Sequence, residues 1–197
     1  MYCCVEYFQL SICCDFLESF LVLFFFTEIF LRKKGESSSL KADASDHGTT
    51  RIIFATYISA ILFLLVLTVA KIGFFENVVV GWIGLFCMAF GLILRCLSMR
   101  ELGKFYSRTL RTIDGQKLIS TGPYRIIRHP GYLSSICIWV GMGLALQNII
   151  LIPVFLLLFV SVYIYRITSE EKMLVAEFGE DYRTYQSASW RLLPYLY

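Results

Sequence analysis

The feature that most constrains this chain is the length of its apolar blocks. The stretch from Tyr132 to Arg166 is almost wholly apolar, and a helix needs only about 20 apolar residues to cross a bilayer. Such a block is too long for one crossing and too hydrophobic for a soluble domain. Composition agrees, because 57% of the 197 residues are hydrophobic and only 17% are charged. We therefore expect an all-α, multi-pass transmembrane helical bundle.

About five spans are predicted from block length. Three of them precede residue 100, over residues 8–31, 52–70 and 78–97. Two more, over 132–146 and 149–167, form an apolar helical hairpin that turns at the Gln147-Asn148 pair. The first hairpin helix is short for a full crossing, so we expect it to tilt or to begin inside the membrane. The third span contains three glycines that predict close helix approach, namely Gly81, Gly84 and Gly91.

The basic residues support this topology. Five spans bring the loop 32–51, the segment 95–131 and the tail from Arg166 to one side, and these regions hold 17 of the 18 Lys and Arg residues. Lys71 is the exception. The positive-inside rule then assigns this side to the cytoplasm. Because basic residues 32–34 follow the first apolar stretch instead of preceding it, that stretch is expected to be a retained anchor.

Nucleic-acid binding and metal chemistry are not expected. Nucleic-acid binding would need a basic face on a soluble module, whereas the basic residues here alternate with apolar blocks. The seven Cys include no CxxC pair, and the chain has only two His, so a metal site has poor support. Buried, reduced thiols are favoured over palmitoylation for the Cys3-Cys4 and Cys13-Cys14 doublets.

Two polar segments meet on the predicted cytoplasmic side. In residues 121–132, Pro130 should open the following helix and keep His129 outside it. His129 would then lie at a helix N-terminus, which favours an anionic group. In residues 166–185, apolar positions at helical spacing predict a C-terminal amphipathic helix, and Arg166 shares a face with Glu170. The alternatives are an interfacial segment in contact with lipid headgroups and an ordinary surface ion pair.

Together these motifs resemble the isoprenylcysteine carboxyl methyltransferase family and, more loosely, the membrane phospholipid methyltransferases. The resemblance covers residues 102–194 and rests on four motifs in a fixed order. They are Gly122-x-Tyr124-Arg125-x-x-Arg128-His129-Pro130-x-Tyr132, Glu170-Glu171-x-x-Leu174, Phe178-Gly179-x-x-Tyr182-x-x-Tyr185 and Arg191-x-x-Pro194. It divides the chain into N-terminal transmembrane helices over residues 1–100 and a cofactor-binding, catalytic region over residues 101–197.

The resemblance implies an S-adenosyl-L-methionine site at the cytoplasmic end of the bundle. It also implies roles for two residues of the last span: Glu170 would bind the cofactor, and Arg166 would anchor the substrate carboxylate. With His129, these are the residues expected to be catalytic. The full cofactor-binding set that the resemblance implies is Gln116, Lys117, Leu118, Ile119, Tyr124, His129, Pro130, Gly131, Tyr132 and Glu170.

The acceptor class follows from the Arg166 match. A carboxylate is already ionised near neutral pH, so its methylation needs no general base, and a guanidinium suits it as a partner. An amine acceptor would be repelled by Arg166 and would need a base such as His129. We therefore expect a lipid-tailed carboxylate acceptor, such as a C-terminal isoprenylcysteine, that enters the site from the bilayer. Membrane lipids are also expected partners. The expected location is the endoplasmic reticulum in a eukaryote or the cell membrane in a prokaryote.

Three alternatives remain open from the sequence. Sterol and steroid reductases share an Arg-His-Pro-x-Tyr core and use NADPH, and Arg125 with Arg128 could bind its 2′-phosphate. A phospholipid N-methyltransferase would fit the looser part of the resemblance. A non-catalytic membrane scaffold would have kept the fold without the reaction.

Overall fold

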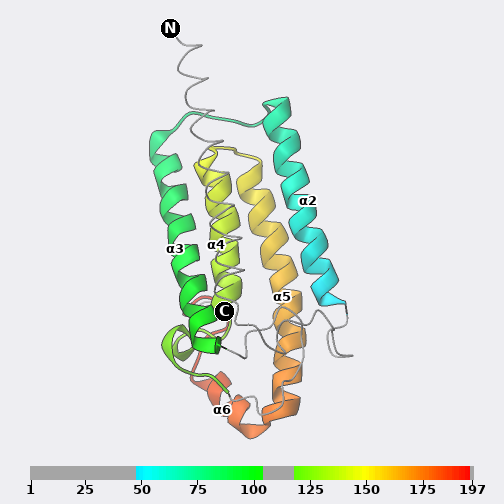
Figure 1. Ribbon diagram of the computed structural model, residues 1–197, viewed down its shortest axis with the longest axis vertical. Coiled ribbons are helices and arrows are strands. Elements are labelled where there is room, and N and C mark those ends of the chain that lie inside the picture. The colour runs from blue at the N-terminus through cyan, green and yellow to red at the C-terminus, as the bar shows by residue number, and fades with distance from the viewer. Residues whose placement is uncertain (1–47, 104–117, 196–197) are drawn as a thin grey trace.

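The computed structural model describes residues 48–103 and 118–195, and within these ranges it is a bundle of helices (Figure 1). Four helices make up the bundle, and two short ones lie at its lower end. In chain order they are α2 (Thr49–Ala70), α3 (Val78–Leu102), the 3-10 helix η4 (Gly122–Arg125), α4 (Pro130–Ala145), α5 (Leu151–Phe178) and α6 (Glu180–Ser187). The all-helical prediction is confirmed for the described part of the chain.

The predicted spans correspond closely to these helices. α2 and α3 begin and end near the predicted bounds, although α3 continues to Leu102. α2, α3 and α5 are long and apolar enough to cross a membrane, whereas α4 has 16 residues and is shorter, as the sequence predicted. The first predicted span, residues 8–31, and most of the loop 32–51 lie outside the described residues.

Local sequence signals set the helix ends. The Asn77 side chain accepts hydrogen bonds from the backbone N–H groups of Val79 and Val80, at 3.1 and 3.2 Å, and so caps α3. Pro130 occupies the first turn of α4, where a missing N–H has no consequence. At the predicted hairpin turn, buried Asn148 accepts hydrogen bonds from the first backbone N–H groups around the start of α5.

The end of α5 differs from the prediction. The last span was expected to stop at Ile167, with an amphipathic helix leaving it. Instead α5 continues unbroken to Phe178 and ends at Gly179, whose φ of 55° is in the left-handed region that favours glycine. The predicted amphipathic segment is therefore divided between the polar end of α5 and the short α6.

Glycines allow α3 and α4 to approach closely. A Cβ on Gly84 would lie 2.7 Å from the carbonyl oxygen of Gly141, and one on Gly91 would lie 2.7 Å from that of Ser134. Neither contact would be tolerated, so the close approach predicted for this face of α3 is confirmed at both positions. Gly81 instead faces the side chain of Gln147.

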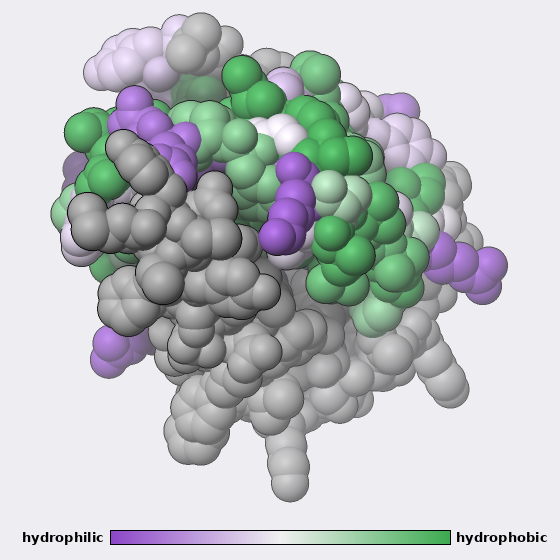
Figure 2. All heavy atoms as spheres, turned by 90° about the horizontal axis from the view of Figure 1, so that it is seen from above, coloured by the Kyte–Doolittle hydropathy of each residue, from purple (hydrophilic) through white to green (hydrophobic). Residues whose placement is uncertain are grey.

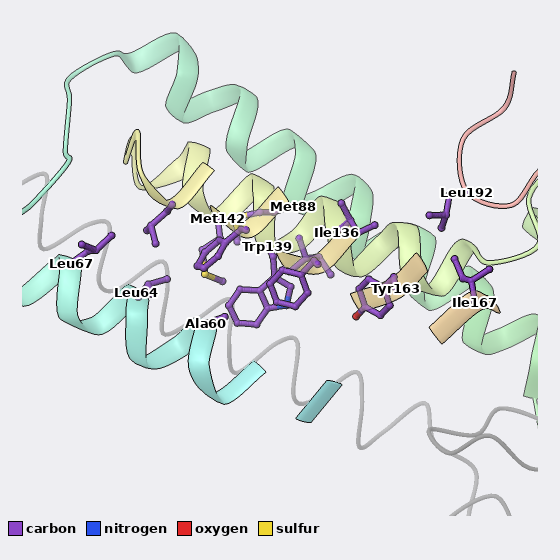
Figure 3. Packing of buried hydrophobic residues seen from close by; sticks show 14 residues of the cluster. Ala60, Leu64, Leu67, Met88, Ile136, Trp139, Met142, Tyr163, Ile167 and Leu192 are labelled. Atoms are coloured by element: carbon purple, nitrogen blue, oxygen red, sulfur yellow. The ribbon is translucent and has the colours of Figure 1, made fainter. Parts of the chain in front are cut away.

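An aromatic cluster fills the core between α4 and α5 (Figure 3). Trp139 stacks on Phe159 with ring centroids 4.8 Å apart, and Phe155 meets Trp139 edge-on at 5.3 Å. The outward faces of α2 and α3 expose large apolar side chains such as Leu62 and Phe86. Figure 2, the view from above, shows hydrophobic surface broken by separate hydrophilic side chains. Exposed apolar faces of this kind are what a bilayer would cover.

Candidate active site

The polar motifs meet at one end of the bundle, where α2 begins, α3 ends, α4 begins and α5 extends beyond the other helices (Figure 1). The loop that leads into α4 is fixed to α3, because the Thr121 hydroxyl donates to Glu101 at 2.8 Å. Gly122 then adopts a φ of 56° as the loop turns. This turn delivers His129 to the N-cap position of α4, as the sequence predicted.

The hydroxyl group of Tyr132 links the two predicted catalytic residues of α5. It donates to Glu170 Oε2 at 2.6 Å and accepts from Arg166 Nε at 3.3 Å. Arg166 is only 2% exposed, whereas the Glu170 side chain is 25% exposed. A buried cation and a more accessible carboxylate are therefore held on the same face of α5, one turn apart.

Arg166 also contacts the first turn of α2. Its Nη1 atom donates to the Thr49 hydroxyl and, at 3.1 Å, to the Thr50 hydroxyl. Thr49 is fully buried, with 1% of its surface exposed. The guanidinium is thus held on two edges by hydroxyl groups from two different helices. No sequence motif pointed to these threonines, which lie in the half of the chain without a family signature.

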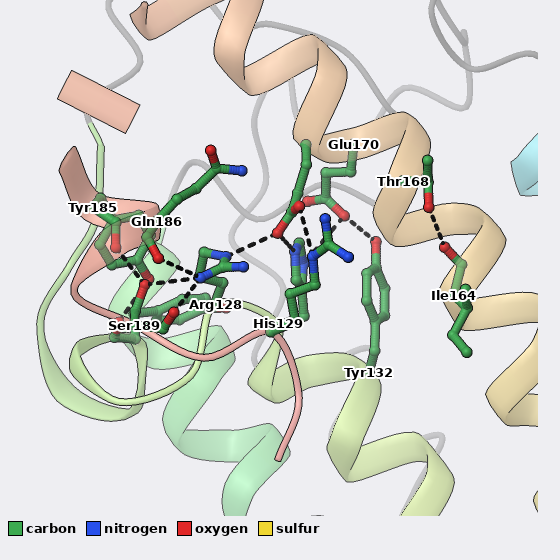
Figure 4. Close-up of polar contacts among 12 residues, drawn as sticks. Arg128, His129, Tyr132, Ile164, Thr168, Glu170, Tyr185, Gln186 and Ser189 are labelled. Carbon is green, nitrogen blue, oxygen red and sulfur yellow. Dashed lines mark hydrogen bonds and ion pairs between the residues drawn. The ribbon is translucent and has the colours of Figure 1, made fainter. Parts of the chain in front are cut away.

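His129 lies between two carboxylates (Figure 4). Its Nδ1 is 3.7 Å from Glu170 Oε2, and its Nε2 is 3.4 Å from Glu171 Oε1. The ring also stacks on Tyr132, with centroids 5.5 Å apart and 10° between the planes. His129 is 5% exposed, so its orientation is fixed by neighbours on three sides.

Glu171 joins three segments of the chain. It accepts hydrogen bonds from Arg128 Nε at 2.8 Å and from Arg191 Nε at 3.0 Å. The backbone of the C-terminal segment runs beside the loop, with Arg128 N–H donating to the Trp190 carbonyl at 2.7 Å. A parallel bridge pairs Ile127 with Trp190. Glu171 therefore fixes the C-terminal segment beside His129, a role that the sequence did not predict.

Two tyrosines of α6 border this cluster. Burial raises the pKa of Tyr185 to about 12, an effect that nearby Arg128 partly opposes, and its hydroxyl donates to the Tyr124 carbonyl at 2.6 Å. Burial also raises the pKa of Tyr182, and the charges of Glu171 and Glu170 raise it further. The Tyr182 hydroxyl is buried and has no hydrogen-bond partner among the described residues.

The remaining predicted cofactor residues have different surroundings. Tyr124 is buried in η4, and Leu118 and Ile119 lie in irregular chain and are partly exposed. A Cβ added to Gly131 would meet no described atom within 4 Å, so there is open space beside the first turn of α4. Residues 116 and 117, the predicted Gln116 and Lys117, lie outside the described residues.

A second polar cluster lies deeper between the helices. Arg95 donates to the Ser135 hydroxyl at 2.9 Å, and the hydroxyls of Tyr57 and Tyr163 are 2.7 Å apart. Tyr163 stacks on Tyr132, with ring centroids 4.8 Å apart. Through this stack, the cluster contacts the site from the interior of the bundle. Within the described ranges, no group of three His, Cys, Asp or Glu residues could hold a metal ion.

The chain is similar in sequence to proteins of one known family. Residues 82–176 match the model of the isoprenylcysteine carboxyl methyltransferase family. The protein-S-isoprenylcysteine O-methyltransferase B of Arabidopsis thaliana is 30% identical over 152 residues, which cover 71% of this chain and 77% of that protein. The protein-S-isoprenylcysteine O-methyltransferase of Dictyostelium discoideum is 29% identical over 57% of this chain, and the match spans 48% of that relative.

Two further matches concern the fold and the reductase alternative. A solved structure of a eukaryotic intramembrane Ras methyltransferase aligns with 87% of this chain and 60% of its own, with a TM-score of 0.60 and 21% identity. This likeness establishes a shared fold. The Delta(14)-sterol reductase of Mus musculus is 26% identical over 45% of this chain, which corresponds to 22% of that protein.

Proposed function

The chain belongs to the isoprenylcysteine carboxyl methyltransferase family, and we propose that it is an integral membrane methyltransferase dependent on S-adenosylmethionine. We propose as its acceptor a carboxylate on a lipid-linked molecule, such as a C-terminal isoprenylcysteine. The observation that carries this proposal is the Tyr132 hydroxyl, which holds the guanidinium of Arg166 beside the carboxylate of Glu170. A site of this kind presents one group for an anion and another for a cation.

The donors and acceptors present fit the charged end of the proposed cofactor. That end carries an ammonium, which suits the accessible carboxylate of Glu170, and a carboxylate, which suits the Gly131 N–H at the N-terminus of α4. Pro130 has no N–H, and the N–H groups of Tyr132 and Leu133 donate to the His129 carbonyl. The open space beside Gly131 would give access to its N–H group. Tyr182 adds a buried hydroxyl without a described partner, and a bound ligand would satisfy it.

The proposed cofactor-binding set keeps the residues expected from the family resemblance. Glu170 and His129 would bind through side chains, and Leu118 with Ile119 largely through backbone. The others in the proposed set are Gln116, Lys117, Tyr124, Pro130, Gly131 and Tyr132.

The chemistry proposed for the chain's own residues is orientation and exclusion of water. S-adenosylmethionine, when bound, supplies a methyl group activated by a sulfonium sulfur. A carboxylate acceptor needs no proton removed, so no general base is required. Arg166 would bind the carboxylate and orient one oxygen toward the methyl group, because its planar fork has fixed donor directions. The burial of Arg166 and His129 strengthens these interactions by keeping water away.

The reductase alternative has less support from the surroundings of the two loop arginines. The side chain of Arg128 is 8% exposed and is already bonded to Glu171 and to the backbone carbonyl of Gln186. These contacts stabilise the structure of the site, so Arg128 is a poor partner for a 2′-phosphate. Arg125 is exposed, and one exposed arginine is weaker support for NADPH than a basic cluster.

The positions of the basic residues support a proposed orientation of the protein in the membrane. Arg51, Arg100 and Arg125 belong to the end of the bundle that holds the site, and Lys71 follows α2 at the opposite end. We propose that the end with the site faces the cytoplasm. The membrane would be the endoplasmic reticulum in a eukaryote or the cell membrane in a prokaryote.

Two experiments test the proposed cofactor and the proposed acceptor separately. Equilibrium binding to the purified protein in lipid nanodiscs, with labelled S-adenosylmethionine against NADPH, distinguishes a methyltransferase from a reductase. Membranes that contain the protein are then incubated with labelled S-adenosylmethionine and a prenylcysteine analogue. We expect label that mild base releases, as from a carboxyl methyl ester. Label stable to base would indicate N-methylation and would argue against Arg166 as a carboxylate anchor.

A further inference from the structure

Arg166 cannot set its own orientation. A long side chain loses considerable rotamer entropy when it is fixed, and the guanidinium is a planar group whose N–H bonds point in fixed directions. The orientation must therefore come from the groups that bind the guanidinium. Tyr132 accepts from Nε on one edge, at 3.3 Å.

The other edge of the guanidinium is held by α2. The hydroxyls of Thr49 and Thr50 both accept from Nη1 of Arg166. Both threonines are more than one hundred positions away from Arg166 in sequence, so this contact is made by the packing of α2 on α5. Because Thr49 is 1% exposed, water does not replace its hydroxyl around the guanidinium.

We infer that Thr49 and Thr50 are positioning residues that orient Arg166 toward the carboxylate of the acceptor. This inference rests on the proposed function, since it concerns the group that would bind the acceptor. It assigns a role in substrate recognition to α2, which lies outside residues 82–176, the part that matches the family model. The two hydroxyls act through Arg166 and need not touch the acceptor.

The experiment replaces the hydroxyls without changing side-chain shape. Thr49→Val and Thr50→Val remove the acceptors of the Arg166 hydrogen bonds, whereas Thr49→Ser and Thr50→Ser retain them. Thr56→Val is the matched control, because Thr56 is a buried threonine of the same helix whose hydroxyl donates to the Ile52 carbonyl at 2.8 Å. All variants are reconstituted in nanodiscs and assayed for methyl transfer to a prenylcysteine analogue.

We expect each Val variant to raise the KM for the acceptor by about tenfold, as for loss of a hydrogen bond to a charged group. S-adenosylmethionine affinity should stay unchanged, and the Ser variants should restore the KM. In an Arg166→Lys background, the Val substitutions should have little further effect, because the guanidinium that they orient is gone. A purely structural role would instead alter stability and cofactor affinity in both backgrounds.

The outcomes are distinguishable. If wild-type protein transfers no label, the proposed function is overturned and this inference falls with it. If wild-type protein is active and the Val variants at both positions keep the wild-type KM, the inference alone is overturned. The same holds if Thr56→Val raises the KM equally, because the effect would then belong to α2 as a whole. Thr50→Val keeps the test valid should the buried Thr49→Val protein fail to fold, since Thr50 is only half-buried.

Discussion

The hydroxyl of Tyr132 on α4 lies 2.6 Å from the carboxylate of Glu170 on α5, and this short hydrogen bond is the closest polar link between the two helices at the site. The same hydroxyl accepts from Arg166. One neutral group therefore controls the separation of two opposite charges.

Replacing Tyr132 by Phe should remove the hydrogen bonds to Glu170 and Arg166 while keeping the aromatic ring. The stacks on His129 and Tyr163 would remain, so folding should be largely preserved. Loss of hydrogen bonds to two charged groups should lower kcat/KM by roughly ten- to one-hundredfold. Steady-state assays measure this effect. Tyr165→Phe is the control, because Tyr165 is 48% exposed on α5, the helix that carries Arg166 and Glu170, and should retain activity.

Glu171 should contribute to folding more than an exposed glutamate does. Its side chain is 5% exposed and pairs with Arg128 and Arg191. Glu171→Gln would leave Arg128 buried without its charge partner and should destabilise the protein by about 3 kcal/mol. Glu180→Gln breaks an exposed pair with Arg183 and should change stability by less than about 1 kcal/mol. Thermal unfolding in detergent compares the two, and equal shifts would contradict this account.

The contact between α3 and α4 should reject any side chain at Gly84. A methyl group there would lie 2.7 Å from the Gly141 carbonyl and would also clash with the backbone of Ala145. We expect Gly84→Ala to destabilise the bundle by about 1–3 kcal/mol, despite the higher helix propensity of alanine. Gly131→Ala is the control, since its Cβ would enter open space. A Gly84→Ala protein as stable as wild type would show that the helices can separate freely.

Tyr182 should respond to substitution in the opposite way from most buried tyrosines. Its hydroxyl has no partner among the described residues, so Tyr182→Phe should leave folding stability unchanged or slightly higher. Its raised pKa keeps the hydroxyl protonated at neutral pH, as a donor requires. If that donor binds the cofactor, the variant should bind S-adenosylmethionine about tenfold more weakly in calorimetry. Unchanged affinity would remove Tyr182 from the site.

Much of the fold could be predicted from the sequence, because the determining signals are local. Pro130 is tolerated in the first turn of a helix but not in its interior, and the length of each apolar block predicts a membrane span. The end of α5 was harder to predict, because the length of an apolar block indicates how much of a helix spans the membrane and not where the helix ends. Residues 168–178 mix polar and apolar side chains and are mostly helix-forming, so the helix continues until Gly179.

The site was predictable only in part. Motif residues such as His129 and Glu170 were brought together as expected, at 3.7 Å. The partners of Glu171 were not foreseen, because neighbouring residues on a helix point about 100° apart and only the packed chain shows what each one meets. The contact of Thr49 with Arg166 likewise depends on the packing of two distant helices, for which no local signal exists.

The continuity of α5 has a consequence for the lipid environment. Arg166, Glu170 and Glu171 lie on one unbroken helix of 28 residues, which is about 42 Å long, while α4 has only 16 residues. Bilayer thickness acts on the tilt of such helices. A change in acyl-chain length would therefore move the charged groups of α5 relative to the start of α4, so the thickness of the host membrane becomes a variable of the reaction itself.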